Sequence, residues 1–175
     1  PDNPTTCRRQ RQMCIRDRDR NYQKNLTILI IDNIIDPRNL GSCLRSAAVL
    51  GVDAVIINKH QCAPVNQVVH DVSSGGIELL NIFYVSNLIN CLKHLQDENI
   101  KVFGLSEHAD MSYQNCNFEN STAIVMGSEE FGIRQKTAEK CDLLINLSDN
   151  KNFKSFNVAV ATGIILSEVV RQRKC

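Results

Sequence analysis

The feature that most constrains the fold of this chain is a regular alternation of short apolar runs with segments of helical periodicity. The apolar runs have the length of strands buried on both faces, and apolar residues recur at helical spacing in the segments that follow them. Strands are predicted near residues 26–31, 54–57, 80–85, 101–105, 122–126 and 143–146, and helices near 40–50, 86–97, 134–140 and 157–172. This alternation predicts an α/β fold with a mainly parallel sheet flanked by helices.

The length of 175 residues predicts one folded domain, which we expect to span residues 23–175. Residues 1–22 lack both apolar periodicity and the apolar segment of a signal peptide, so we expect a disordered or artefactual tail such as a cloning scar. Residues 1–25 hold seven Lys and Arg against three Asp, which makes an RNA-binding arm the alternative. The rest of the chain then has 13 basic and 16 acidic residues, a net charge of −3.

Two classes of protein are disfavoured by composition. The apolar runs are far shorter than the ~18 residues that cross a bilayer, which predicts a soluble cytoplasmic protein without a membrane partner. The eight cysteines and four histidines are scattered, without the close pairs that zinc sites use. We therefore expect reduced cytosolic thiols and no bound metal.

Three polar loops follow predicted strands, at residues 36–47, 126–134 and 148–163, where open parallel sheets bind ligands. The first loop reads DPRNLGSCLRSA, and Asn39 is predicted to cap the helix that follows. A glycine inside a helix costs ~1 kcal/mol relative to alanine, so Gly41 predicts that something approaches the backbone closely. Arg45, one turn later, is either a solvated side chain or a functional one.

The other two loops read MGSEEFGIR and SDNKNFKSFNVAVATG. Gly127 follows a buried strand directly and is either a turn glycine or a place where a ligand lies against bare backbone. Ser155 and Asn157 open the last predicted helix, and two such residues exceed what one cap requires. Nucleotide sites of the Rossmann and P-loop types and an α/β-hydrolase site are excluded, because G-x-G, G-K-[ST] and G-x-S-x-G are absent.

Together the three loops resemble the three motifs of the SpoU branch of the SPOUT superfamily, the knotted RNA ribose 2′-O-methyltransferases. The pattern D-P-x-N-x-G-x-x-x-R-x-A is matched by DPRNLGSCLRSA, G-x-E-x-x-G by GSEEFG, and S-x-N-V-x-V-A-x-G by SFNVAVATG. All three occur in the family's order, and the resemblance covers residues 26–173. It implies a C-terminal trefoil knot, which the strand pattern alone does not predict.

The resemblance also implies a cofactor and site residues. S-adenosylmethionine would be held by Gly127, Leu147, Phe156 and Asn157. The implied catalytic residues are Asn39, Arg45, Glu129, Ser155 and Asn157, and the implied RNA contacts are Arg38, Arg45 and Arg134. The family pattern makes Arg45 the base, although a guanidinium is almost always protonated. Arg45 could instead bind an RNA phosphate that assists deprotonation or stabilise the developing alkoxide, and the sequence leaves these roles open.

Within the branch, the motifs look most like those of bacterial enzymes that methylate a guanosine ribose in large-subunit ribosomal RNA. A tRNA substrate is one alternative, and a noncatalytic knotted RNA-binding or assembly module is another. The family habit of packing the last helix across a two-fold axis implies a homodimer. Two departures stand out. LSDNKNFKS lacks the proline and glycine of the family's I-P-M-x-G loop, which predicts weaker cofactor binding. The residues before 26 do not resemble the N-terminal RNA-binding domain of many relatives, so a fragment of a longer protein is one expectation.

Overall fold

The computed structural model describes residues 25–148, 150 and 155–173, so the tail predicted at residues 1–22 lies outside the described residues. Within them, parallel strands form one sheet in the order β3-β2-β1-β6-β4-β7-β5. The strands are β1 Thr27–Ile31, β2 Ala54–Asn58, β3 Ile82–Val85, β4 Lys101–Leu105, β5 Met111–Ser112, β6 Thr122–Met126 and β7 Leu143–Asn146. The direction of strand addition reverses between β1 and β6, which is the switch point of an open α/β sheet.

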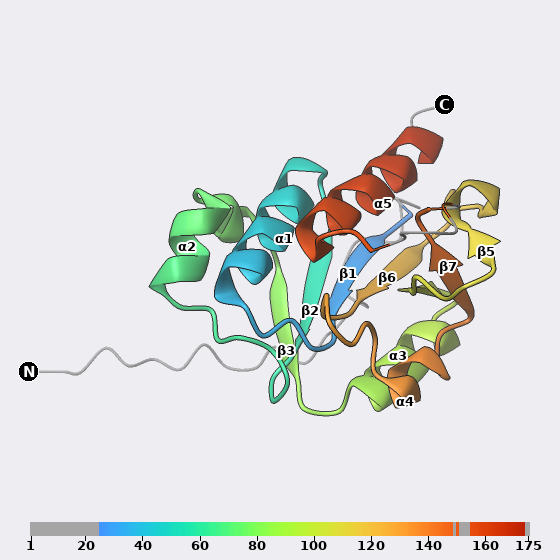
Figure 1. The fold of residues 1–175 in the computed structure, drawn as a ribbon, viewed down its shortest axis with the longest axis horizontal. Helices are drawn as coiled ribbons and strands as arrows, with labels where there is room; N and C mark the ends of the chain where they lie inside the picture. The colour runs from blue at the N-terminus through green and yellow to red at the C-terminus, as the bar shows by residue number, and fades with distance from the viewer. Residues whose placement is uncertain (1–24, 149, 151–154, 174–175) are drawn as a thin grey trace, which may run out of the picture.

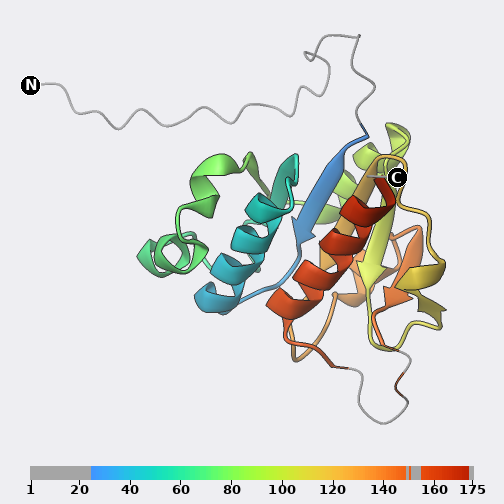
Figure 2. The ribbon, with the colours of Figure 1, turned by 90° about the horizontal axis from the view of Figure 1, so that it is seen from above.

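Helices cover both faces of this sheet, so the fold has three layers (Figures 1 and 2). The helices are α1 Pro37–Val49, α2 Gln67–Ser73, α3 Leu88–Asp97, α4 Gln135–Ala138 and α5 Val158–Arg173, and two short 3-10 helices are η2 Gly76–Leu79 and η3 Tyr113–Asn115. In Figure 1, α1, α2 and α5 lie on one side of the strands, and α3 and α4 lie on the other.

The central strands explain why two separate cores form. All five residues of β1 and all five of β6 are buried. Because successive side chains of a strand point to opposite faces, Leu29 and Ile31 join the core under α1 and α5, whereas Ile28 and Ile30 join the core under α3. Continuous apolar runs are therefore required in β1 and β6, as in other parallel strands covered on both faces.

All six predicted strands and all four predicted helices are confirmed, with ends shifted by no more than three residues. The prediction missed α2, whose seven residues are too few for a clear helical period, although Asn66 caps it by accepting from Val69 N at 3.2 Å. It also treated residues 106–121 as a polar linker. That segment contains β5 and η3, and its Phe118 is fully buried against Phe103.

The C-terminal helix α5 packs against α1 at the site end and is fastened at its other end by Arg173. The guanidinium of Arg173 donates hydrogen bonds of 2.5–3.2 Å to four backbone carbonyls and one hydroxyl. The acceptors are the carbonyl oxygens of Asn25, Leu26, Phe118 and Asn120 and the Oγ1 of Thr27. Arg173 therefore ties the carboxyl end of α5 to the amino-terminal ends of β1 and β6.

Candidate functional site

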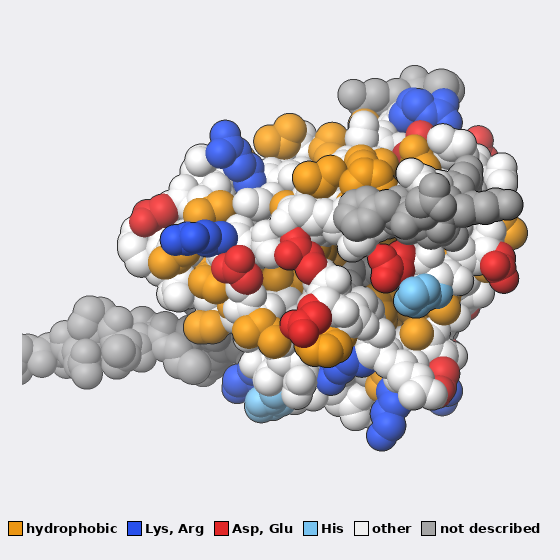
Figure 3. Space-filling view, viewed as in Figure 1, with side chains coloured by type: hydrophobic (Ala, Val, Ile, Leu, Met, Phe, Trp, Pro, Cys, Tyr) orange, Lys and Arg blue, Asp and Glu red, His pale blue; other side chains and the backbone are white. Residues whose placement is uncertain are grey.

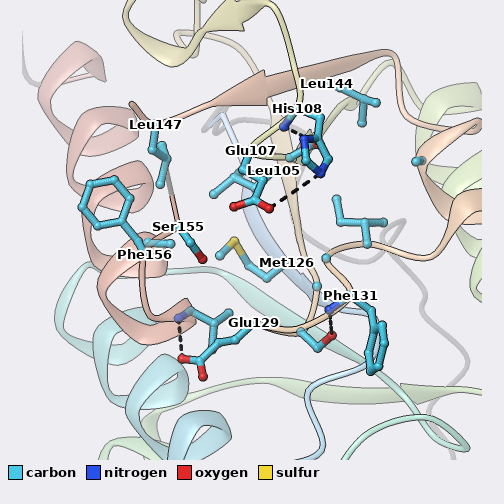
Figure 4. Close-up of a pocket in the computed structure, with 18 of the residues that line it drawn as sticks. Leu105, Glu107, His108, Met126, Glu129, Phe131, Leu144, Leu147, Ser155 and Phe156 are labelled. Atoms are coloured by element: carbon cyan, nitrogen blue, oxygen red, sulfur yellow. Dashed lines mark hydrogen bonds and ion pairs between the residues drawn. The ribbon is translucent and has the colours of Figure 1, made fainter. Parts of the chain in front are cut away.

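A cavity of about 240 Å³ opens at the carboxyl ends of β4, β6 and β7 (Figure 4). Its apolar wall includes Leu105, Met126, Ile133, Leu144, Leu147 and Phe156. Carboxylates of Glu107, Glu129 and Glu130 also line it, whereas the described residues that line it include no Lys or Arg. The cavity therefore combines an apolar surface with a negative charge, and it lies next to the strand-order switch point, where parallel sheets bind ligands.

The three sequence motifs meet at the mouth of this cavity through Glu129, Asn157 and Asn39. The side chain of Asn157 donates from Nδ2 to Asn39 Oδ1 at 3.1 Å and to Glu129 Oε1. The same Glu129 oxygen accepts from the backbone N–H of Val158 at 3.1 Å, as the dashed line in Figure 4 marks. These contacts join residues 28 and 118 positions apart in the sequence. The carboxylate lies at the amino terminus of α5, where the helix dipole stabilises negative charge.

Asn157 is also the capping residue of α5, as its place at the start of the last predicted helix suggested. Its Oδ1 accepts from Ala159 N at 3.0 Å, and its backbone carbonyl accepts from Ala161 N. One side chain thus caps the helix through its oxygen and reaches Glu129 and Asn39 through its nitrogen. The orientation of the helix and the geometry of the site are therefore coupled.

The prediction that Asn39 caps α1 is wrong. The helix begins at Pro37, and the Asp36 side chain caps it by accepting from Arg38 N at 2.9 Å. Proline is favoured at the first helical position because it has no N–H to leave unbonded there. With Asp36 as the cap, the amide of Asn39 is available to Asn157.

The two glycines singled out by sequence are explained by close backbone packing. A Cβ at Gly41 would lie 2.9 Å from the Cβ of Val72 and 3.0 Å from the carbonyl of Val69, so the close neighbour is α2. A Cβ at Gly127 would lie 2.1 Å from the backbone of Gly132. The loop that follows β6 folds back on itself there, with a bridge between Ser128 and Gly132, and Gly132 has a φ of +63°.

The remaining predicted site residues fall into two groups. Gly127, Leu147, Ser155 and Phe156 line the cavity, and Figure 4 shows Leu147 and Phe156 on its α5 side. Arg38 and Arg45 are exposed on α1 and do not line it. The proposed roles of these residues stay predictions, and so does the effect of the unusual loop before Ser155, since residues 149 and 151–154 lie outside the described residues.

Arg134 was predicted to contact RNA, and its described contacts are with Asp32. Its Nε donates to Asp32 Oδ1 at 2.8 Å, its Nη2 contacts the same oxygen, and its backbone N–H donates to Oδ2 at 3.1 Å. Asp32 is fully buried, whereas the Arg134 side chain is 37% exposed. A phosphate contact by Arg134 stays a prediction.

Sequence reasoning missed Asp32 and Asn33 at this edge of the sheet. Asn33 accepts from Ser128 N at 2.8 Å and donates to Ser128 Oγ at 3.4 Å. The available signal was their position, because two polar residues directly follow the buried strand β1 at its carboxyl end. Glu107 and His108, which follow β4 and line the cavity, carry the same signal.

The cysteines of the described segments offer no reactive group to this site. Those that the structure describes are free thiols, and burial raises the pKa of Cys43 on α1 and of Cys62 to about 11. In the same segments no three His, Cys, Asp or Glu side chains gather as a metal site would require. None of the helices described there has the length and apolar character that crossing a bilayer would take.

Comparison with known proteins identifies the family. The model of the SpoU rRNA Methylase family matches residues 26–167. Two curated relatives, both named 23S rRNA (guanosine-2'-O-)-methyltransferase RlmB, are 40% identical over 86% of this chain in Xanthomonas campestris and 42% identical over 83% of it in Escherichia coli strain K12. The chain spans 61% and 60% of their lengths.

A solved structure has the same fold. The SpoU methyltransferase AviRb from Streptomyces viridochromogenes superposes with a TM-score of 0.80 at 25% identity, over 86% of this chain and 61% of that one. The family match covers most of the present chain and contains all three motifs that meet around Glu129. The chain therefore belongs to the SpoU rRNA methylase family.

Proposed function

We propose that this protein transfers a methyl group from S-adenosylmethionine to a ribose 2′-hydroxyl of RNA, and that the substrate is a guanosine in large-subunit ribosomal RNA. The observation that carries the proposal is the contact of Glu129 with Asn157, which in turn contacts Asn39 at the mouth of the cavity. Family membership and the names of the two curated relatives support the reaction and the substrate. The same reasoning makes the cytoplasm the expected place of action.

The cavity fits S-adenosylmethionine in two respects. An apolar wall that includes Leu147 and Phe156 suits the face of a purine ring, and Gly127 lines the same cavity. The cofactor also carries a positively charged sulfonium, which the carboxylates of Glu107, Glu129 and Glu130 would attract. When bound, it supplies an electrophilic methyl group. Gly127, Leu147, Phe156 and Asn157 are the residues that would hold it.

The side chains of this protein would orient the ribose and assist loss of its hydroxyl proton. Asn39 and Asn157 present amide groups at the mouth of the cavity, and Glu129 fixes Asn157 in place. Ser155 lines the cavity and would support the substrate side. Arg45 would bind an RNA phosphate that takes up the proton, act on the hydroxyl as the family pattern has it, or stabilise the developing alkoxide. Arg38 and Arg134 would contact flanking phosphates.

The exposed position of Arg45 on α1 supports a homodimer in which each site borrows residues from the partner. Apolar side chains lie over α5 and the nearby end of α1 in Figure 3, and Phe156 and Val160 are 40% and 50% exposed. A second copy packed on this face would cover them. A C-terminal trefoil knot is the second architectural proposal, supported by family membership and by the contacts of α5 with Glu129 and α1.

The test of function is incorporation of tritiated methyl groups into unmodified ribosomal RNA and tRNA transcripts, alongside calorimetric titration of S-adenosylmethionine. Transfer to ribosomal RNA supports the proposal. Transfer to tRNA alone would support the reaction but contradict ribosomal RNA as the substrate. Cofactor binding without any transfer would favour a noncatalytic RNA-binding module. No measurable cofactor binding would overturn the proposal.

Arg45→Ala tests the chemical assignment. We expect cofactor affinity within a few-fold of the parent and methyl transfer lower by a factor on the order of 10², as when a charge-stabilising or proton-transfer group is lost. Arg38→Ala is the matched control on the same helix, and it should raise the KM for RNA more than it lowers kcat. Transfer at the parent rate by Arg45→Ala would contradict the assigned role.

Mixed dimers test the sharing of sites between protomers. Arg45→Ala and Glu129→Gln proteins, each nearly inactive alone, are unfolded together and refolded as a mixture. If Arg45 acts in the partner's site, a mixed dimer has one site with both defects and one intact site, so activity returns. No recovery, or a monomer of about 20 kDa in sedimentation, would contradict the shared site.

A further inference from the structure

Two buried polar residues directly follow strand β1 and lie next to the loop that carries Glu129. Asp32 is fully buried and Asn33 is 9% exposed, although both lie in the connection between β1 and α1. Buried polar side chains are found where their hydrogen bonds are satisfied. Apart from a bond of 3.5 Å from Asn58 Nδ2 to Asp32 Oδ1, the described side-chain bonds of these two residues go to another loop. The partners are Ser128 and Arg134, about 95 to 102 positions later in the chain.

These contacts hold both ends of the loop after β6. At its start, Asn33 accepts from Ser128 N at 2.8 Å and donates to Ser128 Oγ at 3.4 Å. At its end, Asp32 accepts from the backbone N–H of Arg134 at 3.1 Å and from its guanidinium. Within the loop, Ser128 and Gly132 exchange backbone hydrogen bonds of 2.9 and 3.1 Å.

Beyond the contacts of Ser128, the tip of the loop is held through the Glu129 carboxylate, which accepts from Asn157 and Val158. Glu129, Glu130 and Phe131 are exposed, and Phe131 is 73% exposed. The backbone of the tip is held by Phe131 N, which donates to Ser128 Oγ at 3.1 Å. Ser128 is therefore the residue through which Asn33 reaches the tip, and Glu129 is its immediate neighbour.

Stability alone is a weak reason to bury the Asp32 carboxylate. Removing the Asp32 carboxylate from water is costly, and ion pairs with a buried member often add little compared with apolar residues of similar size. Such a pair does set a definite geometry, because the guanidinium and carboxylate meet in few orientations. Here the geometry that it sets is that of the loop bearing Glu129.

We propose that Asn33 and Asp32 form a clamp that positions Glu129 against the amino terminus of α5. Asn33 fixes the start of the loop through Ser128, and Asp32 fixes its end through Arg134. Asn33 and Asp32 are positioning residues, since they reach the site through this loop. The inference rests on the proposed function only for the part that Glu129 plays in methyl transfer.

Amide hydrogen exchange tests the clamp without reference to activity. The backbone N–H of Val158 is bonded to Glu129 Oε1, so its protection reports where that carboxylate lies. Asn33→Ala should speed exchange at Val158 by about tenfold or more, and Ser128→Ala should do so to a smaller extent. Ser128→Ala keeps the N–H that donates to Asn33 and serves as the milder variant if Asn33→Ala folds poorly.

Asn87→Ala is the matched control for this measurement. The Asn87 side chain also accepts from one backbone N–H, that of Asn90 at 3.1 Å, at the start of α3 on the other face of the sheet. It should lower stability without changing exchange at Val158. Unchanged Val158 exchange in both Asn33→Ala and Ser128→Ala would overturn the clamp, whether or not the protein transfers methyl groups.

A double-mutant cycle then tests whether the clamp acts through Glu129. With saturating RNA and cofactor, Asn33→Ala should lower kcat about tenfold in the parent and by less than twofold when Glu129 is already alanine. Equal effects in both backgrounds would mean a general loss of structure and would contradict the inference. A parent without methyl transfer would overturn the proposed function, and the exchange measurement would still decide the clamp.

Discussion

The two ends of α5 are held in opposite ways. At the carboxyl end, Arg173 donates to four backbone carbonyls, and Gln172 exchanges hydrogen bonds with the backbone of Cys116 and Phe118. At the amino end, the helix is held by the side chains of Glu129, Asn157 and Asn39, two of which are exposed.

This difference suggests that one end of α5 contributes mainly to stability and the other end mainly to function. Backbone acceptors are present whatever the side chains of their residues, so the Arg173 contacts depend on the fold and on Arg173 itself. The contacts at the amino end need three particular side chains, and the surface exposure of Glu129 and Asn157 limits what they add to stability. We therefore expect substitutions at the carboxyl end to affect folding and those at the amino end to affect activity.

The largest effect on stability should come from Arg173→Ala. It removes five hydrogen bonds from a charged donor, and we expect the free energy of unfolding to fall by about 3 kcal/mol, since such losses are not additive. In a domain of this size that lowers Tm by about 10 °C. Urea unfolding and thermal melting measure it.

Arg171→Ala is the control for Arg173→Ala at the same helix end. Arg171, whose side chain is 65% exposed, pairs with Glu168, and pairs with a solvent-exposed member contribute about 1 kcal/mol or less. The comparison also predicts that Arg173→Ala keeps methyl transfer within about twofold at temperatures where it is folded. Loss of transfer by a fully folded Arg173→Ala would show that the two ends are not independent.

Glu129→Gln should show the reverse behaviour. The amide oxygen can still accept from Val158 N, so the unfolding free energy should fall by less than about 1 kcal/mol, the usual strength of a charge at a helix terminus. Methyl transfer should fall by a factor on the order of 10², because the negative charge at the mouth of the cavity is lost.

The neighbouring Glu130→Gln is its control. Glu130 lines the same cavity and carries the same charge, so at saturating cofactor Glu130→Gln should keep transfer within about threefold if position matters more than net charge. Equal losses in the two variants would contradict a specific role for Glu129.

Asn157→Ala should lower both stability and activity, and its loss of stability should lie between those of Arg173→Ala and Glu129→Gln. Loss of a helix cap costs about 1 kcal/mol, and loss of the contacts with Asn39 and Glu129 should weaken cofactor binding as well as turnover. Asn87→Ala removes a comparable cap from α3 and should cost similar stability with unchanged cofactor affinity. Titration of S-adenosylmethionine with both variants measures the difference, and equal affinities would mean that Asn157 only caps the helix.

Local pattern was sufficient to predict most elements but failed where elements are short or begin unusually. The runs at residues 101–105, 122–126 and 143–146 became β4, β6 and β7 with those bounds, because strands buried on both faces need continuous apolar residues. The start of α1 was misplaced, although Pro37 after Asp36 is a typical helix start. β5 has two residues and produces no pattern at all.

The site could be predicted only in part, because its contacts link distant segments. Local chemistry identified Asn157 as a cap, but its contact with Asn39 spans 118 positions, and only the family resemblance suggested that these motifs meet. Nothing in the local sequence distinguishes Arg173 from other basic residues near a helix end. Its acceptors lie up to 148 positions away, so its role depends on how the sheet brings Asn25 beside Asn120.

The smallest predicted effect is the pH dependence of the carboxyl end of α5. Hydrogen bonds from Arg171 lower the pKa of Glu168 below its usual value near 4.5, and a bond from Gln172 adds to this, against partial burial. Because the folded pKa is the lower one, ionised Glu168 stabilises the protein fully above the unfolded pKa. That stabilisation is lost as pH falls through the folded pKa. Urea unfolding of the parent and of Glu168→Gln measures this contribution. The two free energies of unfolding should differ by only about 0.3–0.5 kcal/mol at pH 7, which is typical of a solvent-screened pair. The difference should fade as the pH falls below 4.5. A difference that instead grew in acid would mean that the ionised carboxylate of Glu168 destabilises the folded state. The carboxyl end of α5 would then be stabilised by Arg173 and Gln172 without a contribution from Glu168.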